Sequence, residues 1–517
     1  MVISVIEGPP MIHASPHRVG SRLHGLVAIA VLGMVGLLLP SGTPPSAKAV
    51  ESNLPGSIPQ APPYAPGFPI PFPQTVDYRP RQGSVLAFDM DRDGRRDLVV
   101  SIPNGQILVL RPDGTRLPGW PRTFMDLPQP AYPVGEPAIG DLDGDGSPDI
   151  VTCVVSGTPM RRNFLYALRA NGADLPGWPI ELRTAGSEYY TCSNVPTLMA
   201  DLTGDGGLEI IRGMNRGAIL AFKSDGSPLP GWPVRLGPDH DGRIREVNAD
   251  MATADLDGDG HKELIFVESS LAPRLAVVGG DGRMLPGFPK WLTEIVDQQA
   301  PACADLNGDG RLEMVQATLP FEGNVIEPVP EPSPGGPLVP AAVHVIRADG
   351  SSFPGWPRLL QDGAPWGSVV ADLNSDGLMD ILQQDGDELL GLDEEGNVLQ
   401  GFPVAAHRQF VRSQFVEATP WVVGDLNGDR RPDLLQVVSN QYAGSSYLRI
   451  HGLRGTGQPI RGFPFDAPGL LAASRPILTD LDNDGVDDLV MLGSYGGNGG
   501  WSLAAWDLGA LVARTRR

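Results

Sequence analysis

The chain contains few cysteines, fewer basic than acidic residues and no long apolar run. Each of these shortages argues against a class of protein or a kind of partner. Three cysteines in 517 residues are too few for a disulfide scaffold, and a chain of this length can bury a sufficient core without one. Acidic residues exceed Lys and Arg by 61 to 39, for a formal net charge of −22. Because phosphate backbones attract basic surfaces, this excess argues against nucleic acid as a partner.

Recognisable catalytic motifs are also missing. The sequence contains no G-x-S-x-G elbow, no H-E-x-x-H zinc motif and no Walker loop, so the usual signatures of serine hydrolases, zinc proteases and nucleotide-binding enzymes are absent. No catalytic residue is therefore assigned, and the sequence favours binding over catalysis.

No apolar run reaches the roughly twenty residues that a membrane-spanning helix needs. The longest, Leu26–Leu39, follows two arginines and precedes Ala47-Lys48-Ala49, a spacing typical of a signal peptide and its cleavage site. We therefore expect residues 1–49 to be a signal peptide and residues 50–63 to be a Pro-rich linker. The mature protein would then be secreted, periplasmic or on the cell surface without a stable membrane span; an uncleaved membrane anchor is the alternative.

One acidic motif is abundant instead. The nine-residue pattern D-x-[DNT]-x-D-x-x-x-[DE] occurs eight times, at intervals of 50 to 67 residues, which is the spacing of a repeat protein with one supersecondary unit per copy. Side-chain oxygens at positions 1, 3, 5 and 9, with Gly usual at position 6, suit a loop that wraps a calcium ion, and the carbonyl of position 7 supplies a further oxygen. One copy alone could be a turn with capping aspartates. Eight copies in register favour metal binding.

The predicted calcium ligands are positions 1, 3, 5, 7 and 9 of each copy. In chain order they are Asp89, Asp91, Asp93, Arg95 and Asp97; Asp141, Asp143, Asp145, Ser147 and Asp149; Asp201, Thr203, Asp205, Gly207 and Glu209; Asp255, Asp257, Asp259, His261 and Glu263; Asp305, Asn307, Asp309, Arg311 and Glu313; Asp372, Asn374, Asp376, Leu378 and Asp380; Asp425, Asn427, Asp429, Arg431 and Asp433; and Asp480, Asp482, Asp484, Val486 and Asp488. Up to eight Ca²⁺ ions are expected. The third copy is weakened by Thr203, and the seventh has Arg430 where the others have Gly.

Short apolar segments around each copy predict strands. An apolar run precedes each loop, position 2 is Leu or Met and is expected to be core, and a β-branched or aliphatic run follows position 9. A third strand, such as Gln106–Leu110 or Ala218–Phe222, then leads to a turn such as Asp113-Gly114. Next comes a Gly-aromatic-Pro motif that predicts an outer edge strand, where proline costs no ladder bond. Its copies are Pro118–Pro121, Pro176–Pro179, Pro230–Pro233, Pro286–Pro289, Pro354–Pro357, Gly401–Pro403 and Gly462–Pro464.

Four antiparallel strands per unit predict an all-β fold, a β-propeller. Eight loops are followed by only seven Gly-aromatic-Pro motifs, but an eighth, Pro66–Pro69, lies ahead of the first loop. We therefore expect eight blades, with the N-terminal segment supplying the outer strand of the last blade.

These units resemble the FG-GAP or VCBS-type repeats of integrin α-subunit heads and of many secreted bacterial proteins. The resemblance covers residues 64–508 and leaves residues 509–517 as a tail. It implies that each calcium loop joins the first and second strands of a blade. Integrin heads have seven blades, so seven is the alternative to eight.

Function is expected on the face opposite the calcium loops, where variable connections meet on a rigid ring. Candidate contact residues are Arg161, Arg162, Tyr189, Tyr190, His240–Arg245, Trp366, His407–Arg412 and Tyr442. The favoured function is adhesion, or recognition of an extracellular protein or glycan. One alternative is a calcium-dependent enzyme resembling polysaccharide lyases, with an acidic sugar held by Arg243, Arg245, Arg408 and Arg412. Another is a scaffold in an envelope assembly.

Three further expectations concern single segments. Cys153 and Cys192 lie in neighbouring units and either pair or stay free, because sequence does not show whether the sulfurs meet. Cys303 is expected to be a buried strand thiol. The Pro-rich insertion Pro320–Pro340 is expected to be a flexible decoration.

Overall fold

The computed structural model describes one compact unit of the chain. Its described residues are 61–72, 83–102, 105–124, 131–156, 162–182, 192–215, 217–237, 245–247, 250–268, 273–292, 300–326, 329–332, 338–361, 363, 367–405, 415–442, 445–468, 470–472, 474–495 and 500–515. Within these ranges no helix is both long and apolar enough to cross a membrane.

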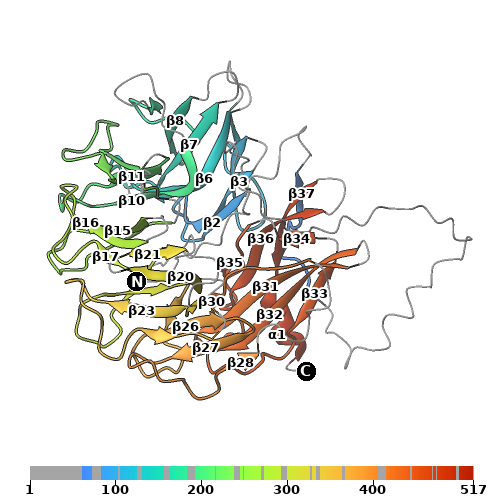
Figure 1. Cartoon of the computed structure of the whole chain (residues 1–517). Coiled ribbons are helices and arrows are strands. Elements are labelled where there is room, and N and C mark those ends of the chain that lie inside the picture. The colour runs from blue at the N-terminus through green and yellow to red at the C-terminus, as the bar shows by residue number, and fades with distance from the viewer. Residues whose placement is uncertain are drawn as a thin grey trace, which may run out of the picture. The chain divides into compact units, whose positions relative to one another are not determined.

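Eight antiparallel sheets follow one another in chain order and form the blades of a propeller ring (Figure 1). Blade 1 contains β2 (Ser84–Phe88), β3 (Asp97–Ile102), β4 (Gln106–Leu110) and β5 (Arg122–Thr123); blade 2, β6 (Ala131–Gly140), β7 (Asp149–Ser156), β8 (Asn163–Arg169) and β9 (Ile180–Glu181); blade 3, β10 (Cys192–Ala200), β11 (Glu209–Met214), β12 (Ala218–Phe222) and β13 (Val234–Arg235); blade 4, β14 (Ala252–Ala254), β15 (Glu263–Glu268), β16 (Arg274–Val278) and β17 (Lys290–Trp291).

The second half of the ring keeps the same order with two split inner strands. Blade 5 contains β18 (Ala302–Ala304), β19 (Glu313–Ala317), β23 (Ala342–Ile346) and β24 (Arg358–Leu359); blade 6, β25 (Val369–Ala371), β26 (Asp380–Asp385), β27 (Glu388–Leu392) and β28 (Val404–Ala405); blade 7, β29 (Phe415–Ala418), β30 (Val422–Gly424), β31 (Asp433–Tyr442), β32 (Ser445–Arg454) and β33 (Phe465–Pro468); blade 8, β34 (Leu470–Ala472), β35 (Ile477–Thr479), β36 (Asp488–Tyr495), β37 (Trp501–Trp506) and β1 (Ile70–Phe72). The eight predicted blades are confirmed.

The N-terminal strand closes the ring as predicted. β1 pairs antiparallel with β37, with Ile70 opposite Leu503 and Phe72 opposite Trp501. Tyr64 extends the contact, because its ring centroid lies 5.4 Å from that of Trp506. Pairing β1 with β37 therefore joins the first described segment to the last blade.

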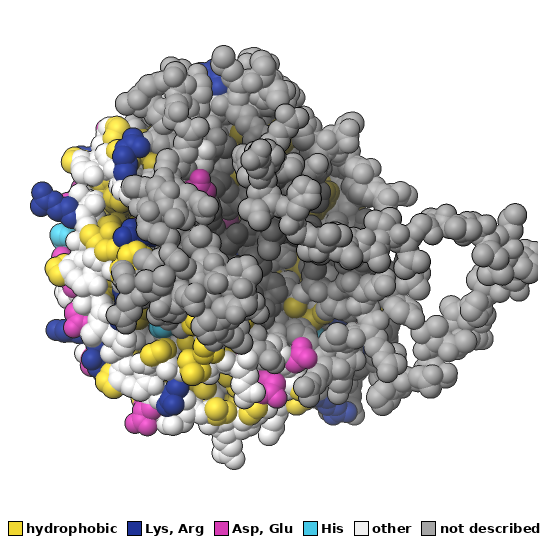
Figure 2. All heavy atoms as spheres, in the orientation of Figure 1, with side chains coloured by type: hydrophobic (Ala, Val, Ile, Leu, Met, Phe, Trp, Pro, Cys, Tyr) yellow, Lys and Arg dark blue, Asp and Glu magenta, His cyan; other side chains and the backbone are white. Residues whose placement is uncertain are grey.

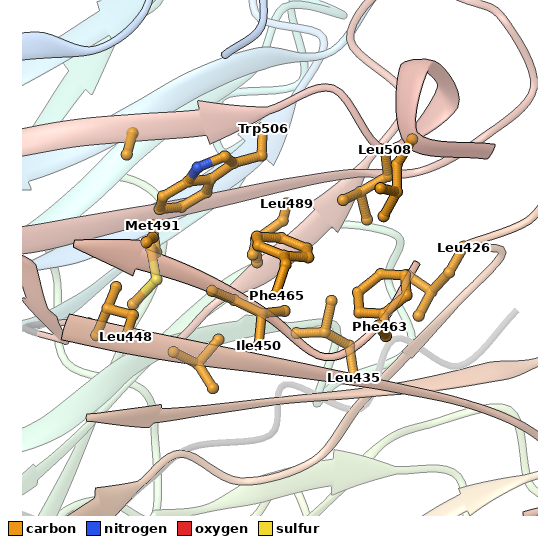
Figure 3. Close-up of a cluster of buried hydrophobic side chains, with 14 of the residues drawn as sticks. Leu426, Leu435, Leu448, Ile450, Phe463, Phe465, Leu489, Met491, Trp506 and Leu508 are labelled. Atoms are coloured by element: carbon orange, nitrogen blue, oxygen red, sulfur yellow. The ribbon is translucent and has the colours of Figure 1, made fainter. Parts of the chain in front are cut away.

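The core lies between neighbouring blades. Second strands such as β3 and β11 are buried along their whole length, because each blade is covered on its two faces by the two neighbouring blades. The position-2 residue of every acidic loop is buried, at 0 to 3% exposure, as the sequence predicted. Figure 3 shows one such contact, in which Ile450 and Phe465 of blade 7 face Leu489 and Met491 of blade 8. Apolar packing of this kind stabilises the ring.

In four blades a tryptophan of the Gly-aromatic-Pro motif binds the blade to the next one. The indole Nε1 atoms of four tryptophans donate hydrogen bonds of 2.7 to 3.0 Å to turn carbonyls of the following blade, from Trp120 to Ala170, Trp178 to Ser224, Trp232 to Gly280 and Trp356 to Glu394. The preceding glycine is required, because a Cβ at Gly119, which has a φ of 92°, would overlap the Asn171 carbonyl. The sequence predicted the edge strand but not this contact between blades.

The segment between β19 and β23 differs from the prediction. Instead of a flexible decoration it contains a three-stranded sheet of β21 (Val329–Pro332), β20 (Phe321–Ile326) and β22 (Leu338–Val339). The prolines of β21 lie on an edge strand, where they are tolerated. At the other end of the chain, Leu508–Thr515 form helix α1, whose Leu508 and Leu511 are buried.

Of the three cysteines, two form a disulfide and one is a free thiol. Cys153 on β7 and Cys192 on β10 form a disulfide between blades 2 and 3, with a Cα–Cα distance of 6.6 Å. Cys303 is a buried thiol on β18, as predicted, and burial raises its pKa to about 12. The disulfide answers the question that the sequence left open.

Candidate metal centres

The eight acidic loops all occupy the same place in their blades. Each joins the inner strand to the second strand, and position 9 is the first residue of β3, β7, β11, β15, β19, β26, β31 or β36. This is the connection that the FG-GAP resemblance implied. All eight loops therefore open on one face of the ring.

One hydrogen-bond pattern holds every loop. The position-1 carboxylate accepts the N–H of position 6 at 2.7 to 3.1 Å. The position-5 carboxylate accepts the N–H of position 7 at 2.8 to 3.0 Å. The position-9 carboxylate accepts the N–H of position 2 at 2.8 to 3.2 Å. The side chains at positions 1, 5 and 9 are thus fixed by backbone donors in all eight copies.

In five loops three carboxylates converge, with oxygens that all lie within 4.8 Å of one another. They are Asp89, Asp91 and Asp97; Asp141, Asp143 and Asp149; Asp255, Asp257 and Asp259; Asp425, Asp429 and Asp433; and Asp480, Asp482 and Asp484. The third, fifth, sixth and seventh loops have Thr203, Asn307, Asn374 and Asn427 at position 3 and so carry one carboxylate fewer, and of these four only the seventh is among the five. Several acidic clusters could therefore bind a metal ion.

The position-9 acids lie at the buried end of these clusters. Burial, and then the charges of the neighbouring loop aspartates, raise the pKa of Asp97, Asp149 and Asp380 to about 6. For the same reasons the pKa reaches about 7 in Glu263 and Asp433 and about 8 in Asp488. The pKa values of Glu209 and Glu313 are raised too.

Buried oxygens without a hydrogen donor support a cation in these loops. Among the described residues, Asp97 Oδ1, Asp141 Oδ1 and the Thr203 hydroxyl are buried and have no hydrogen-bond partner. A buried oxygen without a donor is costly, and a cation would satisfy it while favouring the charged form of the carboxylates. The residues present therefore fit a hard divalent cation.

The seventh loop is formed despite Arg430. This residue adopts the left-handed conformation with a φ of 63°, and its N–H donates to Asp425 Oδ2 at 2.7 Å. Arginine in this conformation costs about 1 kcal/mol more than glycine. The loop in which Arg430 replaces the usual Gly thus has the same backbone pattern as the others.

The predicted contact residues of the opposite face are described only in part. Arg162 Nε lies 2.6 Å from Glu181 Oε1. Residues 161, 189–190, 240–244, 366 and 407–412 lie outside the described ranges, as does the side chain of residue 442. Where side chains are described, Figure 2 shows acidic, basic and apolar groups interspersed on the face in view.

Arg245 was predicted to be a contact residue on the opposite face, and the structure contradicts this. It is only 3% exposed, its Nε lies 3.6 Å from Glu268 Oε2, and its guanidinium lies 5.3 Å from the centroid of Trp291. A carboxylate and an aromatic face hold this arginine inside the blade, because a buried charge needs both compensation and packing. Arg245 is therefore not available to bind an acidic sugar.

Sequence reasoning missed a charged cluster formed by the buried Arg212 and Asp250 and the half-buried Glu136 and Arg475. Arg475 Nη2 of blade 8 lies 3.3 Å from Asp250 Oδ2 of blade 4, so the ion pair joins opposite blades of the ring. Burial and then the charge of Asp250 raise the pKa of Glu136 to about 8. A signal existed, because Glu136, Asp250 and Arg475 each stand five residues before an acidic loop, where the other copies have Ser, Pro, Ala or Gly.

Comparisons with known proteins agree with the repeat architecture. A family model described as FG-GAP-like repeat matches residues 89–152 and 255–315. No curated protein matches the chain.

Similar solved structures include the Vibrio cholerae biofilm matrix protein Bap1, at 13% identity and a TM-score of 0.36, covering 86% of this chain and 91% of that one. The Pseudomonas aeruginosa PilY1 C-terminal domain has 14% identity and a TM-score of 0.37, covering 80% and 87%. A quinohemoprotein alcohol dehydrogenase from Comamonas testosteroni has 11% identity and a TM-score of 0.35, covering 72% and 74%. Likenesses of this size support no statement about function. The family match and the eight acidic blades together show that the chain carries FG-GAP-like repeats, arranged as an eight-bladed β-propeller.

Proposed function

We propose that the chain is a secreted, calcium-binding propeller that recognises an extracellular protein or glycan. The observation that carries the calcium part is the pattern shared by all eight loops, in which backbone N–H groups fix the carboxylates of positions 1, 5 and 9. Oxygens arranged in this way suit Ca²⁺, which takes six to eight oxygen ligands and tolerates irregular geometry. The carboxylates would hold the ion, and the ion would supply charge neutralisation where the second strand of each blade begins.

Two features support an extracellular location. Calcium modules outside the cell bind at about 10⁻⁴–10⁻³ M, a range in which cytosolic calcium would leave them empty. The Cys153–Cys192 disulfide is typical of an oxidising compartment. If residues 1–49 are removed as a signal peptide, the exported protein begins at Val50, which N-terminal sequencing would test.

Recognition is assigned to the face opposite the acidic loops. There the connections between second and third strands, and between consecutive blades, emerge from a ring whose blades are locked by apolar cores and indole hydrogen bonds. Variable loops on a rigid frame are the usual location of binding residues. The polysaccharide lyase alternative depended on four arginines. Of these, Arg245 is buried and the other three lie outside the described residues.

The proposal is tested by applying the protein to arrays of glycans and matrix proteins, once with 2 mM calcium and once with a chelator. We expect selective binding that is weaker or lost in the chelator, because the ring that presents the loops loses stability. Binding to none of the array components would contradict recognition. Release of unsaturated products from an acidic polysaccharide would replace it with lyase activity.

A further inference from the structure

One residue at the end of the third strand, either its last residue or the next one, lies at an equivalent place in seven blades. Its N–H donates to the carbonyl four residues further on, at 2.7 to 3.0 Å, for Arg111, Arg169, Lys223, Gly279, Arg347, Asp393 and Arg454. The backbone is therefore the same, while the side chain changes from cationic to absent to acidic. What this side chain reaches differs from blade to blade.

In blade 2 it reaches the acidic loop. Arg169 Nη2 lies 2.6 Å from Asp143 Oδ2, and Arg169 Nη1 lies 2.6 Å from Asp145 Oδ2. These carboxylates are positions 3 and 5 of the loop, so one guanidinium occupies two of the oxygens that a cation would use. Arg111 in blade 1 and Arg454 in blade 7 make single, longer contacts, 3.4 Å to Asp91 and 3.5 Å to Asp429.

Blade 4 presents the opposite case. Gly279 stands where blade 2 has Arg169, and the loop carboxylates of Asp255, Asp257 and Asp259 converge within 4.8 Å. A side chain would fit at Gly279, because an added Cβ would meet its nearest neighbours, Leu285 and Asp281, at 3.6 and 3.7 Å. Blades 2 and 4 therefore form a natural pair with three converging carboxylates each and a different residue at one position.

From this contrast we propose that this residue at the end of the third strand sets the calcium affinity of its own blade. The proposal rests on the calcium function proposed above and deepens it. Arg169 is a built-in counter-ion that competes with Ca²⁺ for Asp143 and Asp145, and Gly279 leaves the loop of blade 4 open to the ion. The ring then contains strong and weak calcium sites rather than eight equal ones.

The mechanism is a competition between two cations for one set of oxygens. Calcium binding in blade 2 requires the guanidinium to leave both carboxylates, whereas in blade 4 no such contact has to break. Exposed ion pairs of this kind are worth little one at a time, and two of them correspond to a change of about tenfold in affinity. Loop 4 should therefore fill at about one tenth of the calcium concentration that loop 2 needs.

The test reads each loop separately in the whole protein. Carboxylates are labelled with a carbodiimide and an amine while Ca²⁺ is titrated, and mass spectrometry gives the calcium concentration at which each loop peptide becomes protected. Two reciprocal variants are compared with wild type, namely Arg169→Gln and Gly279→Arg. Thermal unfolding confirms that both variants are folded.

We expect Arg169→Gln to lower the midpoint of loop 2 about tenfold without moving loop 4. Gly279→Arg should raise the midpoint of loop 4 by a similar factor without moving loop 2. Protection of both loops with midpoints unchanged by either variant would overturn this inference and leave the calcium proposal standing. A rise in the loop 2 midpoint in Arg169→Gln would also overturn it, because the arginine would then orient the ligands. Absence of protection in every loop would reject calcium binding itself.

Discussion

Replacing Glu263 by Gln should reveal whether a position-9 carboxylate is a metal ligand or only a structural acceptor. Burial and three loop aspartates raise the pKa of Glu263 from 4.5 to about 7. Its contribution to stability is thus fully present below pH 4.5 and lost as the pH rises through about 7. In metal-free protein at pH 8 the charged side chain therefore costs on the order of 3 kcal/mol. Glutamine keeps an oxygen for the Leu256 N–H, bonded at 2.8 Å in the wild type, and removes this cost.

Calcium should oppose that gain. With 10 mM Ca²⁺ and a dissociation constant of about 10⁻⁴–10⁻³ M, wild type gains about 1.4–2.7 kcal/mol from the site, which the variant largely lacks. The stability difference between the variant and wild type should therefore shrink by about that amount when calcium replaces the chelator.

Urea unfolding at pH 8, with chelator and with 10 mM calcium, measures both differences. Asp281→Asn is the matched control, because Asp281 lies in an exposed turn of the same blade and its side chain accepts the Arg283 N–H. It should change stability little in either condition. If Glu263→Gln alters stability equally with and without calcium, the carboxylate is not a metal ligand and the reasoning is refuted.

Three other perturbations test the contacts between blades. Arg475→Met should destabilise by about 3 kcal/mol or more because it removes the ion-pair partner of the buried Asp250, and adding Asp250→Asn should recover most of the loss. Urea unfolding midpoints measure both effects, and additive losses would contradict the pairing. Trp232→Phe should cost about 0.5–1.5 kcal/mol by removing one indole hydrogen bond, and an unchanged midpoint would show that this bond contributes nothing. Replacing Cys153 and Cys192 by Ser should cost about 2–5 kcal/mol in oxidised protein, and wild type under reducing conditions should match the variant.

Features that depend on neighbouring residues, or on the number of repeats, were predictable from the sequence. The acidic pattern fixed the position of each loop, and Leu142 and its counterparts at position 2 were identified as core because they sit between polar ligands. Counting motifs gave eight blades, and the displaced motif at Pro66–Pro69 gave the closure by β1, which the pairing with β37 confirms. Each of these inferences needed only neighbouring residues or a count of repeats.

Features that depend on contacts between distant residues were not predictable. Arg245 appears in a charged, loop-like run, and only the fold shows that Glu268 and Trp291 enclose it. The pairing of Asp250 with Arg475 joins residues 225 positions apart; their shared place five residues before an acidic loop marks both as unusual, but it does not show that they meet. The role of tryptophan in the Gly-aromatic-Pro motif was hidden for the same reason, since the acceptor of Trp232 lies in the next blade.

The central claim is that the acidic loops are calcium sites, and counting the bound ions tests it most directly. Equilibrium dialysis against 10 mM free Ca²⁺, followed by elemental analysis, gives the number of ions per chain. The account predicts at least five, one for each loop whose carboxylates already converge, and at most eight. A chain that binds no calcium under these conditions would contradict it.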